Sequence, residues 1–321
     1  MRQLVTTLVR KLPRLIPVIL IVTFVTFAIM HLLPGDPARA VLGDDATLEQ
    51  IEAFREAEGL DRPMLVQYVD WMAGAATGDF GTSVRSGQDT LSVIVARLPV
   101  SLQLMVQAQL LALVLAIPWA LISAYRAGSR FDKASTYLGF GMISVPPFIV
   151  GILLIFIFAV WLGWLPATGY VPITVDFTAN MRTMIMPTLA LALAEIATYM
   201  RLLRSDLVAT LNEDYLNLAK SKGLPVWYIM LRHALRPSCF SLVTLTGLNF
   251  ARLIGGSVIV EVLFALPGVG RLIIDSIFAR DLTIVQTAVL LIALMYVVIN
   301  LMVDMVYAGL DPRVRETAGR A

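Results

Sequence analysis

The chain has 321 residues, of which 58% are hydrophobic and only 15% are charged, and its mean hydropathy is +0.79. A soluble domain is about 45–50% apolar and about 25% charged, so this composition excludes an ordinary soluble domain. The net charge of +2 indicates no nucleic-acid partner, and the single cysteine, Cys239, excludes an internal disulfide.

Six segments are apolar enough for a membrane span, which needs about 20 predominantly apolar residues. In chain order they cover about residues 13–33, 100–125, 135–162, 184–204, 237–260 and 285–310. The first segment could instead belong to a cleaved signal peptide, because Ala38-Arg39-Ala40 is similar to a small-residue cleavage site. Its apolar run is, however, longer than the roughly 7–15 residues of the apolar region of a signal peptide. The sequence therefore predicts an all-α polytopic membrane protein with six transmembrane helices.

Basic residues indicate the orientation, because they accumulate in loops that stay in the cytoplasm. With the N terminus inside, sixteen Lys and Arg residues lie on the inner side and eight on the outer side, and only Arg252 lies within a span. Both termini are therefore predicted to be cytoplasmic. The chain divides into a cytosolic N terminus with the first span (1–33), an outer segment (34–98), a core (99–310) with a cytosolic loop (205–236), and a cytosolic tail (311–321).

The outer segment is acidic, with eleven Asp and Glu residues against five arginines and a net charge of −6. Residues 48–60 and 63–71 have the pattern of short amphipathic helices. The segment is interpreted either as a solvated cap over the spans or as a surface that helps to receive another protein.

Two charges lie inside predicted spans, Glu195 in the fourth and Arg252 in the fifth. Each costs about 2.5–3.5 kcal/mol to insert, so each is a candidate for function. At 1.5 Å per residue they lie roughly 16 Å and 12 Å from the outer surface, within reach of one another. They are expected either to form a buried ion pair or to line a pathway through the membrane.

A polar, basic island at 213–237 separates the fourth and fifth spans. The spacing of Thr210 and Glu213 predicts a capping box, and Gly223 before Leu224-Pro225 predicts the end of a helix of about ten residues. Ala219 and Gly223 would give this helix a flat face. It needs a partner, because a helix this short cannot bury its apolar side chains alone: Tyr215, Leu216 and Leu218.

The turn at 267–271 and the amphipathic stretch 271–281 are predicted to rest at the outer mouth of the spans. The charged residues there are interpreted either as a solvated face or as part of a gate: Arg271, Asp275, Arg280 and Asp281.

Motifs of soluble enzymes are absent from the sequence. It has no G-x-x-x-x-G-K-[ST] phosphate loop, and its only two histidines, His31 and His233, are assigned to opposite sides of the membrane, which excludes an H-E-x-x-H zinc site. The sequence therefore predicts no catalytic residue and no metal ligand.

The island resembles the cytoplasmic coupling loop of ABC-importer permeases. In their dipeptide, oligopeptide and nickel branch this loop reads D-Y-x-x-x-A-x-[AS]-K-G followed by H-A-L-R. The matching residues here are Asp214, Tyr215, Ala219, Ser221, Lys222, Gly223 and 233–236. Four further stretches agree with that branch: 31–38 (HLLPGDPA), 78–83 (GDFGTS), 266–277 (LPGVGRLIIDSI) and 300–315 (NLMVDMVYAGLDPRVR). The resemblance therefore covers essentially the whole chain.

The resemblance implies the type I (MetI-like) ABC-importer permease fold in the bacterial inner membrane. It implies a homologous second permease subunit in a heterodimer, two ATPase subunits that use ATP and Mg²⁺, and a periplasmic substrate-binding protein. No cofactor is expected in this chain, and the substrate would be a peptide or a related small polar solute. The expected ATPase-coupling residues are Glu213, Asp214, Tyr215, Leu216, Ala219, Lys220, Lys222, Gly223 and Leu224. The expected outer-gate or binding-protein contacts are Arg271, Asp275, Arg280 and Asp281.

Two other classes are weighed against this one. A proton-coupled secondary transporter would use Glu195 or Asp304 as a proton relay and predicts inverted repeats, of which the two halves of the sequence give no convincing sign. A membrane-embedded hydrolase would need a nucleophile and a base at matching depth, and the sequence offers no such pair.

Overall fold

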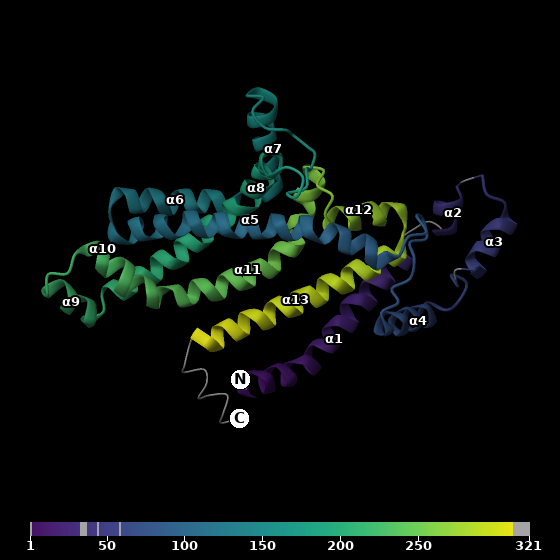
Figure 1. Cartoon of the computed structure of the whole chain (residues 1–321), viewed down its shortest axis with the longest axis horizontal. Helices are drawn as coiled ribbons and strands as arrows, with labels where there is room; N and C mark the ends of the chain where they lie inside the picture. The colour runs from purple at the N-terminus through teal and green to yellow at the C-terminus, as the bar shows by residue number, and fades with distance from the viewer. Residues whose placement is uncertain (1, 33–36, 44, 58, 311–321) are drawn as a thin grey trace. The chain divides into compact units, whose positions relative to one another are not determined.

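The computed structural model describes residues 2–32, 37–43, 45–57 and 59–310 (Figure 1). These residues form helices, with one isolated antiparallel bridge between Thr82 and Asp89. The chain divides into two compact units, Met1–Ser101 with Pro267–Val298, and Leu102–Leu266 with Ile299–Ala321. The predicted all-α fold class is confirmed, whereas the predicted tail 311–321 lies outside the described residues.

The first unit holds the N-terminal helix and the predicted outer segment. Its helices are α1 (Arg2–Leu32), α2 (Pro37–Leu42), α3 (Leu48–Ala57), α4 (Met64–Thr77), the start of α5 (Thr90–Tyr125), α12 (Val269–Ala279) and most of α13 (Leu282–Leu310). The two outer helices predicted over 48–60 and 63–71 are confirmed as α3 and α4. A capping box starts α3, since the Thr47 and Gln50 side chains each accept a hydrogen bond from the other's backbone N–H.

Aromatic packing holds α4 against α1. Tyr68 on α4 lies edge-on to Phe24 and Phe27, and its hydroxyl is 2.9 Å from the Thr23 hydroxyl. Tyr68 is buried, so this contact combines apolar burial with a satisfied polar end, as buried tyrosines require.

A small apolar core joins α12 to α5 and α13. It consists of Ile94, Val269, Leu272, Ile284 and Ala288. The backbone N–H of Val269 also donates to the Ser101 hydroxyl at 2.9 Å. This hydrogen bond satisfies a donor in the first turn of α12, which has no partner within the helix.

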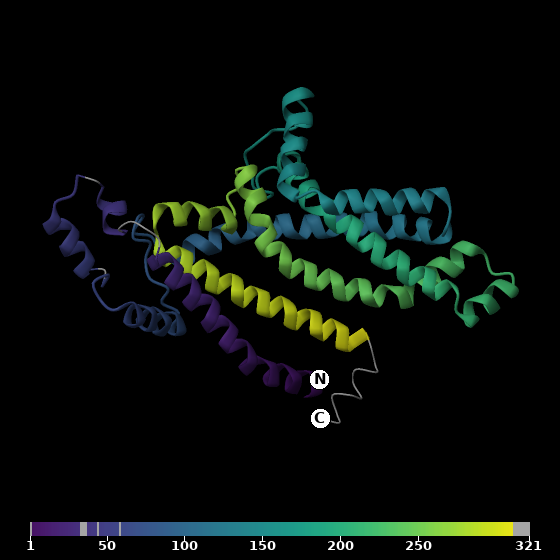
Figure 2. The ribbon, with the colours of Figure 1, turned by 180° about the vertical axis from the view of Figure 1, so that it is seen from behind.

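The second unit is a helical bundle. Besides most of α5 it contains α6 (Arg130–Ser144), α7 (Pro147–Leu154), the π-helix η1 (Ile155–Trp161), α8 (Phe177–Leu211), α9 (Asp214–Ser221), α10 (Val226–Tyr228), the π-helix η2 (Ile229–Ala234) and α11 (Leu235–Leu263). Four fully buried alanines follow one another at a spacing of four along α5, which lets neighbouring backbones approach closely: Ala108, Ala112, Ala116 and Ala120. Both views show α9 and α10 at one end of the bundle formed by α5, α6, α8 and α11 (Figure 2).

Within the described residues, four helical segments are long and apolar enough to cross a membrane: Thr90–Tyr125, Phe177–Leu211, Val226–Leu263 and Leu282–Val303. A shorter apolar stretch, Ile16–Leu32, corresponds to the first predicted span. The predicted third span, 135–162, is not continuous, because α6 and the helix that follows it meet at an angle of 95°. Pro146 and Pro147 explain the bend, since a proline has no N–H to donate and keeps the preceding residue out of the helical region.

Candidate functional site

The short helix α9 follows α8 after a turn of two residues, Asn212 and Glu213. The predicted capping box was wrong. Thr210 lies in the last turn of α8, its hydroxyl is 3.0 Å from that of Ser238 on α11, and no side chain caps α9 at Glu213. The predicted stop is confirmed, because Gly223 has a φ of +75°, which only glycine adopts without strain.

Two faces of α9 have different environments. Leu216 is fully buried and Ala219 is 9% exposed, so both pack inward against the rest of the bundle. The predicted flat docking face through Ala219 is therefore wrong, because its methyl group is already in contact with this chain. At 100° per residue, Asp214, Leu218 and Ser221 lie on the opposite side, and Leu218 is 57% exposed. Asp214, Leu218 and Ser221 therefore form the outward face of α9.

Most other predicted coupling residues are exposed: Glu213, Asp214, Tyr215, Lys220, Lys222 and Gly223, while Leu224 is half-buried. The Tyr215 hydroxyl donates to the His233 carbonyl at 3.5 Å, and the Lys220 ammonium donates to the Leu211 carbonyl at 3.4 Å. These two hydrogen bonds connect α9 to η2 and to the end of α8. The sequence analysis missed further exposed apolar side chains nearby in the chain: Val226, Trp227 and Leu231.

The two charges inside the spans do not form the ion pair considered above. The Asn249 side-chain amide donates to the Glu195 carboxylate at 2.5 Å, and no ion pair within 4.0 Å joins Glu195 to Arg252, although both lie in the described part of the chain. Arg252 is instead exposed on α11. Asn249 is buried and was missed by the sequence analysis, which considered only charges in the spans. The side chain of Asp304 lies outside the described residues.

The four predicted outer residues differ in their surroundings. Arg271 and Asp275 form an ion pair at 3.6 Å along the exposed face of α12, and Arg280 ends that helix in the left-handed region with a φ of +56°. Asp281, however, is only 3% exposed. Its carboxylate accepts a hydrogen bond from the Ser83 hydroxyl at 2.5 Å and another from the Ile284 N–H at 3.3 Å. Asp281 therefore forms a buried junction between Ser83 and the first turn of α13, and it is not exposed for contact with a partner.

We expect Asp281→Ala to lower the free energy of unfolding by about 1–3 kcal/mol, because it leaves the buried Ser83 hydroxyl and a helix N-terminus without an acceptor. The control is Asp275→Ala, which removes an exposed carboxylate and should cost less than about 0.5 kcal/mol. Chemical denaturation of the purified protein measures both. Equal losses in the two variants would show that Asp281 is no junction.

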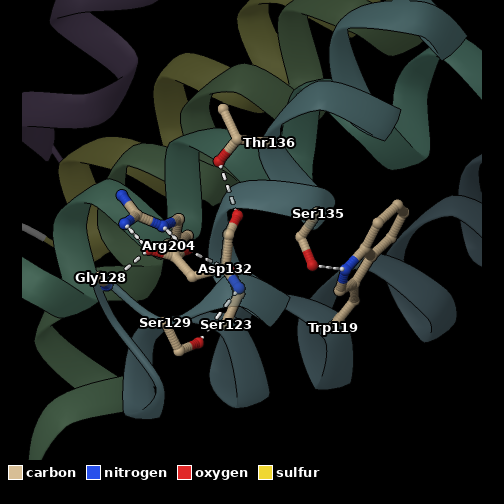
Figure 3. A network of polar contacts seen from close by, with 8 residues as sticks. All are labelled: Trp119, Ser123, Gly128, Ser129, Asp132, Ser135, Thr136 and Arg204. Atoms are coloured by element: carbon tan, nitrogen blue, oxygen red, sulfur yellow. Dashed lines mark hydrogen bonds and ion pairs between the residues drawn. The ribbon is translucent and has the colours of Figure 1, made fainter.

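A buried acidic residue, Asp132, forms a polar network that the sequence analysis also missed (Figure 3). Its carboxylate pairs with Arg204 on α8, 72 residues away in the chain. The sequence indicates only the local part of this network, because Ser129 and Asp132 have the spacing of a helix start. The Ser129 hydroxyl does accept a hydrogen bond from the Asp132 backbone N–H. Arg204 was counted above only as one more basic residue on the inner side.

Among the described residues, no group of three or more His, Cys, Asp or Glu side chains is placed to hold a metal ion.

The chain matches two related family models. The model "Binding-protein-dependent transport system inner membrane component" covers residues 116–316, and a model of the N-terminal part of the same membrane component covers residues 4–105. A putative peptide transport system permease protein of Brucella abortus (strain 2308) is 39% identical over 308 residues, which are 96% of this chain and 98% of that protein. The oligopeptide transport system permease protein AppB of Bacillus subtilis (strain 168) and the glutathione transport system permease protein GsiC of Escherichia coli (strain K12) are each 36% identical, with the same coverage.

Proposed function

This chain belongs to the family of binding-protein-dependent transport system inner membrane components, and we propose that it imports peptides or related small polar solutes as one of two permease subunits. The three relatives named above, with their peptide, oligopeptide and glutathione substrates, support this substrate class. ATP-dependent uptake of a labelled peptide by the reconstituted transporter tests it, and competition by unlabelled peptides, glutathione or a nickel complex then narrows the substrate.

The observation that carries the coupling step is the outward face of α9. Leu218 is exposed at the end of the bundle, while Leu216 and Ala219 attach the helix to the bundle. Because buried residues attach this short helix to the bundle, a partner that contacts Leu218 can displace the helix together with the bundle. In this proposal the ATPase subunits bind α9, and ATP-driven closure of the ATPase pair shifts the spans between inward-open and outward-open states.

The proposed complex contains one copy of this chain, one homologous permease subunit, two ATPase subunits and a periplasmic binding protein. The mass of the intact complex, purified in detergent with its partner subunits, tests this composition. A complex that contains two copies of this chain would contradict the heterodimer.

The proposed orientation places both termini and α9 in the cytoplasm and α3 outside. A Cys239→Ser background with a single cysteine introduced at Leu48 or Asn217, both exposed, tests it. A membrane-impermeant maleimide applied to spheroplasts should label the first variant and not the second. The reverse pattern would contradict the orientation.

Arg252 is proposed to face the water-filled pathway, because an exposed arginine inside a span is too costly to place in hydrocarbon. We expect Arg252→Gln to accumulate normally and to lower uptake by roughly tenfold, which corresponds to about 1.4 kcal/mol. Arg130→Gln, the same change at an exposed residue in the first turn of α6, should leave uptake unchanged. Failure of Arg252→Gln to accumulate, or unchanged uptake, would argue against a place in the pathway.

A further inference from the structure

The Asp132 carboxylate lies where α5, α6 and α8 meet, and its side chain is 5% exposed. One oxygen accepts hydrogen bonds from the Ser123 hydroxyl at 2.7 Å and from Arg204 Nε at 2.6 Å. The other accepts from the Gly128 N–H at 2.9 Å and from Arg204 Nη2 at 2.5 Å (Figure 3). The donors come from the end of α5, the α5–α6 turn and α8, so one buried carboxylate joins all three elements.

This junction lies on the helix that leads directly into α9. Arg204 precedes the end of α8 at Leu211 by seven residues, or about 10 Å, and α9 begins three residues later. Two other contacts brace the same end of α8. The Arg201 guanidinium lies 4.1 Å from the centre of the Phe140 ring on α6, and the Thr210 hydroxyl contacts Ser238 on α11.

The chemistry of the pair suits the transmission of a displacement better than it suits stability. A buried ion pair adds little net stability compared with an apolar pair of similar size, because both charges lose their hydration. A guanidinium fork that meets both oxygens of a carboxylate fixes rotation as well as distance. Apolar side chains in the same place would pack but could slide past each other.

We propose that Asp132 and Arg204 are positioning residues for coupling: they lock the α5–α6 turn to α8, so that a displacement of α9 moves the three helices together. This inference rests on the proposed function, because it takes α9 as the place where the ATPase subunits act. Neither residue contacts substrate or nucleotide in this proposal. Their effect passes through the helices that they join.

The first test uses Arg204→Lys, which keeps the positive charge beside Asp132 and loses the fork. The complete transporter is reconstituted in proteoliposomes with its binding protein, and a radiolabelled peptide that the binding protein retains serves as the probe. The variant should accumulate and hydrolyse ATP, while the amount of peptide taken up per ATP should fall at least fivefold. Arg130→Lys, the same kind of change at an exposed residue in the first turn of α6, should leave the ratio of uptake to ATP unchanged.

The second test separates positioning from folding with the double variant Asp132→Leu/Arg204→Met. This pair leaves no buried charge unpaired, so the variant should accumulate, although the Ser123 hydroxyl and the Gly128 N–H lose their acceptor. The proposal expects the ratio of uptake to ATP to stay low. A wild-type ratio in either variant, or an Arg204→Lys protein that does not accumulate, would overturn it. Failure of the proposed function gives a different result, since the wild-type transporter would then show no ATP-dependent uptake at all.

Discussion

Leu218→Arg should reduce the ATP hydrolysis that loaded binding protein stimulates by about 100-fold, while the chain still accumulates in the membrane. Leu218 is 57% exposed and touches no core, so its replacement should not unfold the bundle. Arginine is a good helix former, so α9 should persist. Leaving a charge unpaired in an interface costs about 2–5 kcal/mol, and each 1.4 kcal/mol is a factor of ten.

The matched control is Leu218→Met, which keeps an apolar side chain of similar size at the same exposed place. Stimulated hydrolysis should then equal that of the wild type. Normal stimulation in Leu218→Arg would remove α9 from the coupling interface. Ala219 and Gly223 are poorer test sites, because Ala219 is nearly buried and Gly223 needs its positive φ. Substitutions there would disturb the fold of the loop as well as any docking.

We expect Gly151→Leu to destabilise the protein. Gly151 lies on α7, where a Cβ atom alone would come within 2.6 Å of the Leu263 side chain and 3.2 Å of the Phe264 ring. Phe264 is 2% exposed and cannot move aside into solvent. Overpacking of this kind costs typically 1–3 kcal/mol, which for a protein of this size lowers the thermal midpoint by roughly 2–5 °C.

Gly141→Leu on α6 is the control for this prediction. A Cβ at Gly141 meets no atom within 4 Å, and a helical glycine lowers stability by about 0.5–1 kcal/mol relative to alanine. The Gly141 variant should therefore unfold at the wild-type temperature or slightly above it. Thermal unfolding of the purified proteins, followed by fluorescence, compares the two. Equal midpoints would mean that α7 does not pack against the end of α11 as described.

The features that the sequence predicted correctly depend on local patterns. Apolar runs located the long helices, amphipathic spacing located α3 and α4, and Gly223 marked the stop after α9. Local patterns were also misleading where two boundaries were close together. Thr210 and Glu213 have capping-box spacing, yet α8 continues to Leu211 and the Thr210 hydroxyl contacts Ser238 on another helix.

The rest of the candidate site depends on contacts between residues that are far apart in the chain. Asn249 meets Glu195, 54 residues away, and Arg204 meets Asp132 across 72 residues. The inward position of Leu216 on α9 also depends on packing, because composition alone leaves it equivalent to Leu218. These pairings follow from tertiary packing, which no short window of sequence contains.

The most direct test of the central claim is the energy source for uptake in proteoliposomes that contain this chain, the second permease subunit and both ATPase subunits. Loaded binding protein is added outside, ATP is trapped inside, and uptake of a labelled peptide is measured with and without an ionophore that collapses the proton gradient. Uptake should require both ATP and binding protein, should be insensitive to the ionophore, and should remain dependent on ATP in Glu195→Gln. Uptake driven by a proton gradient alone, without ATP, would contradict it.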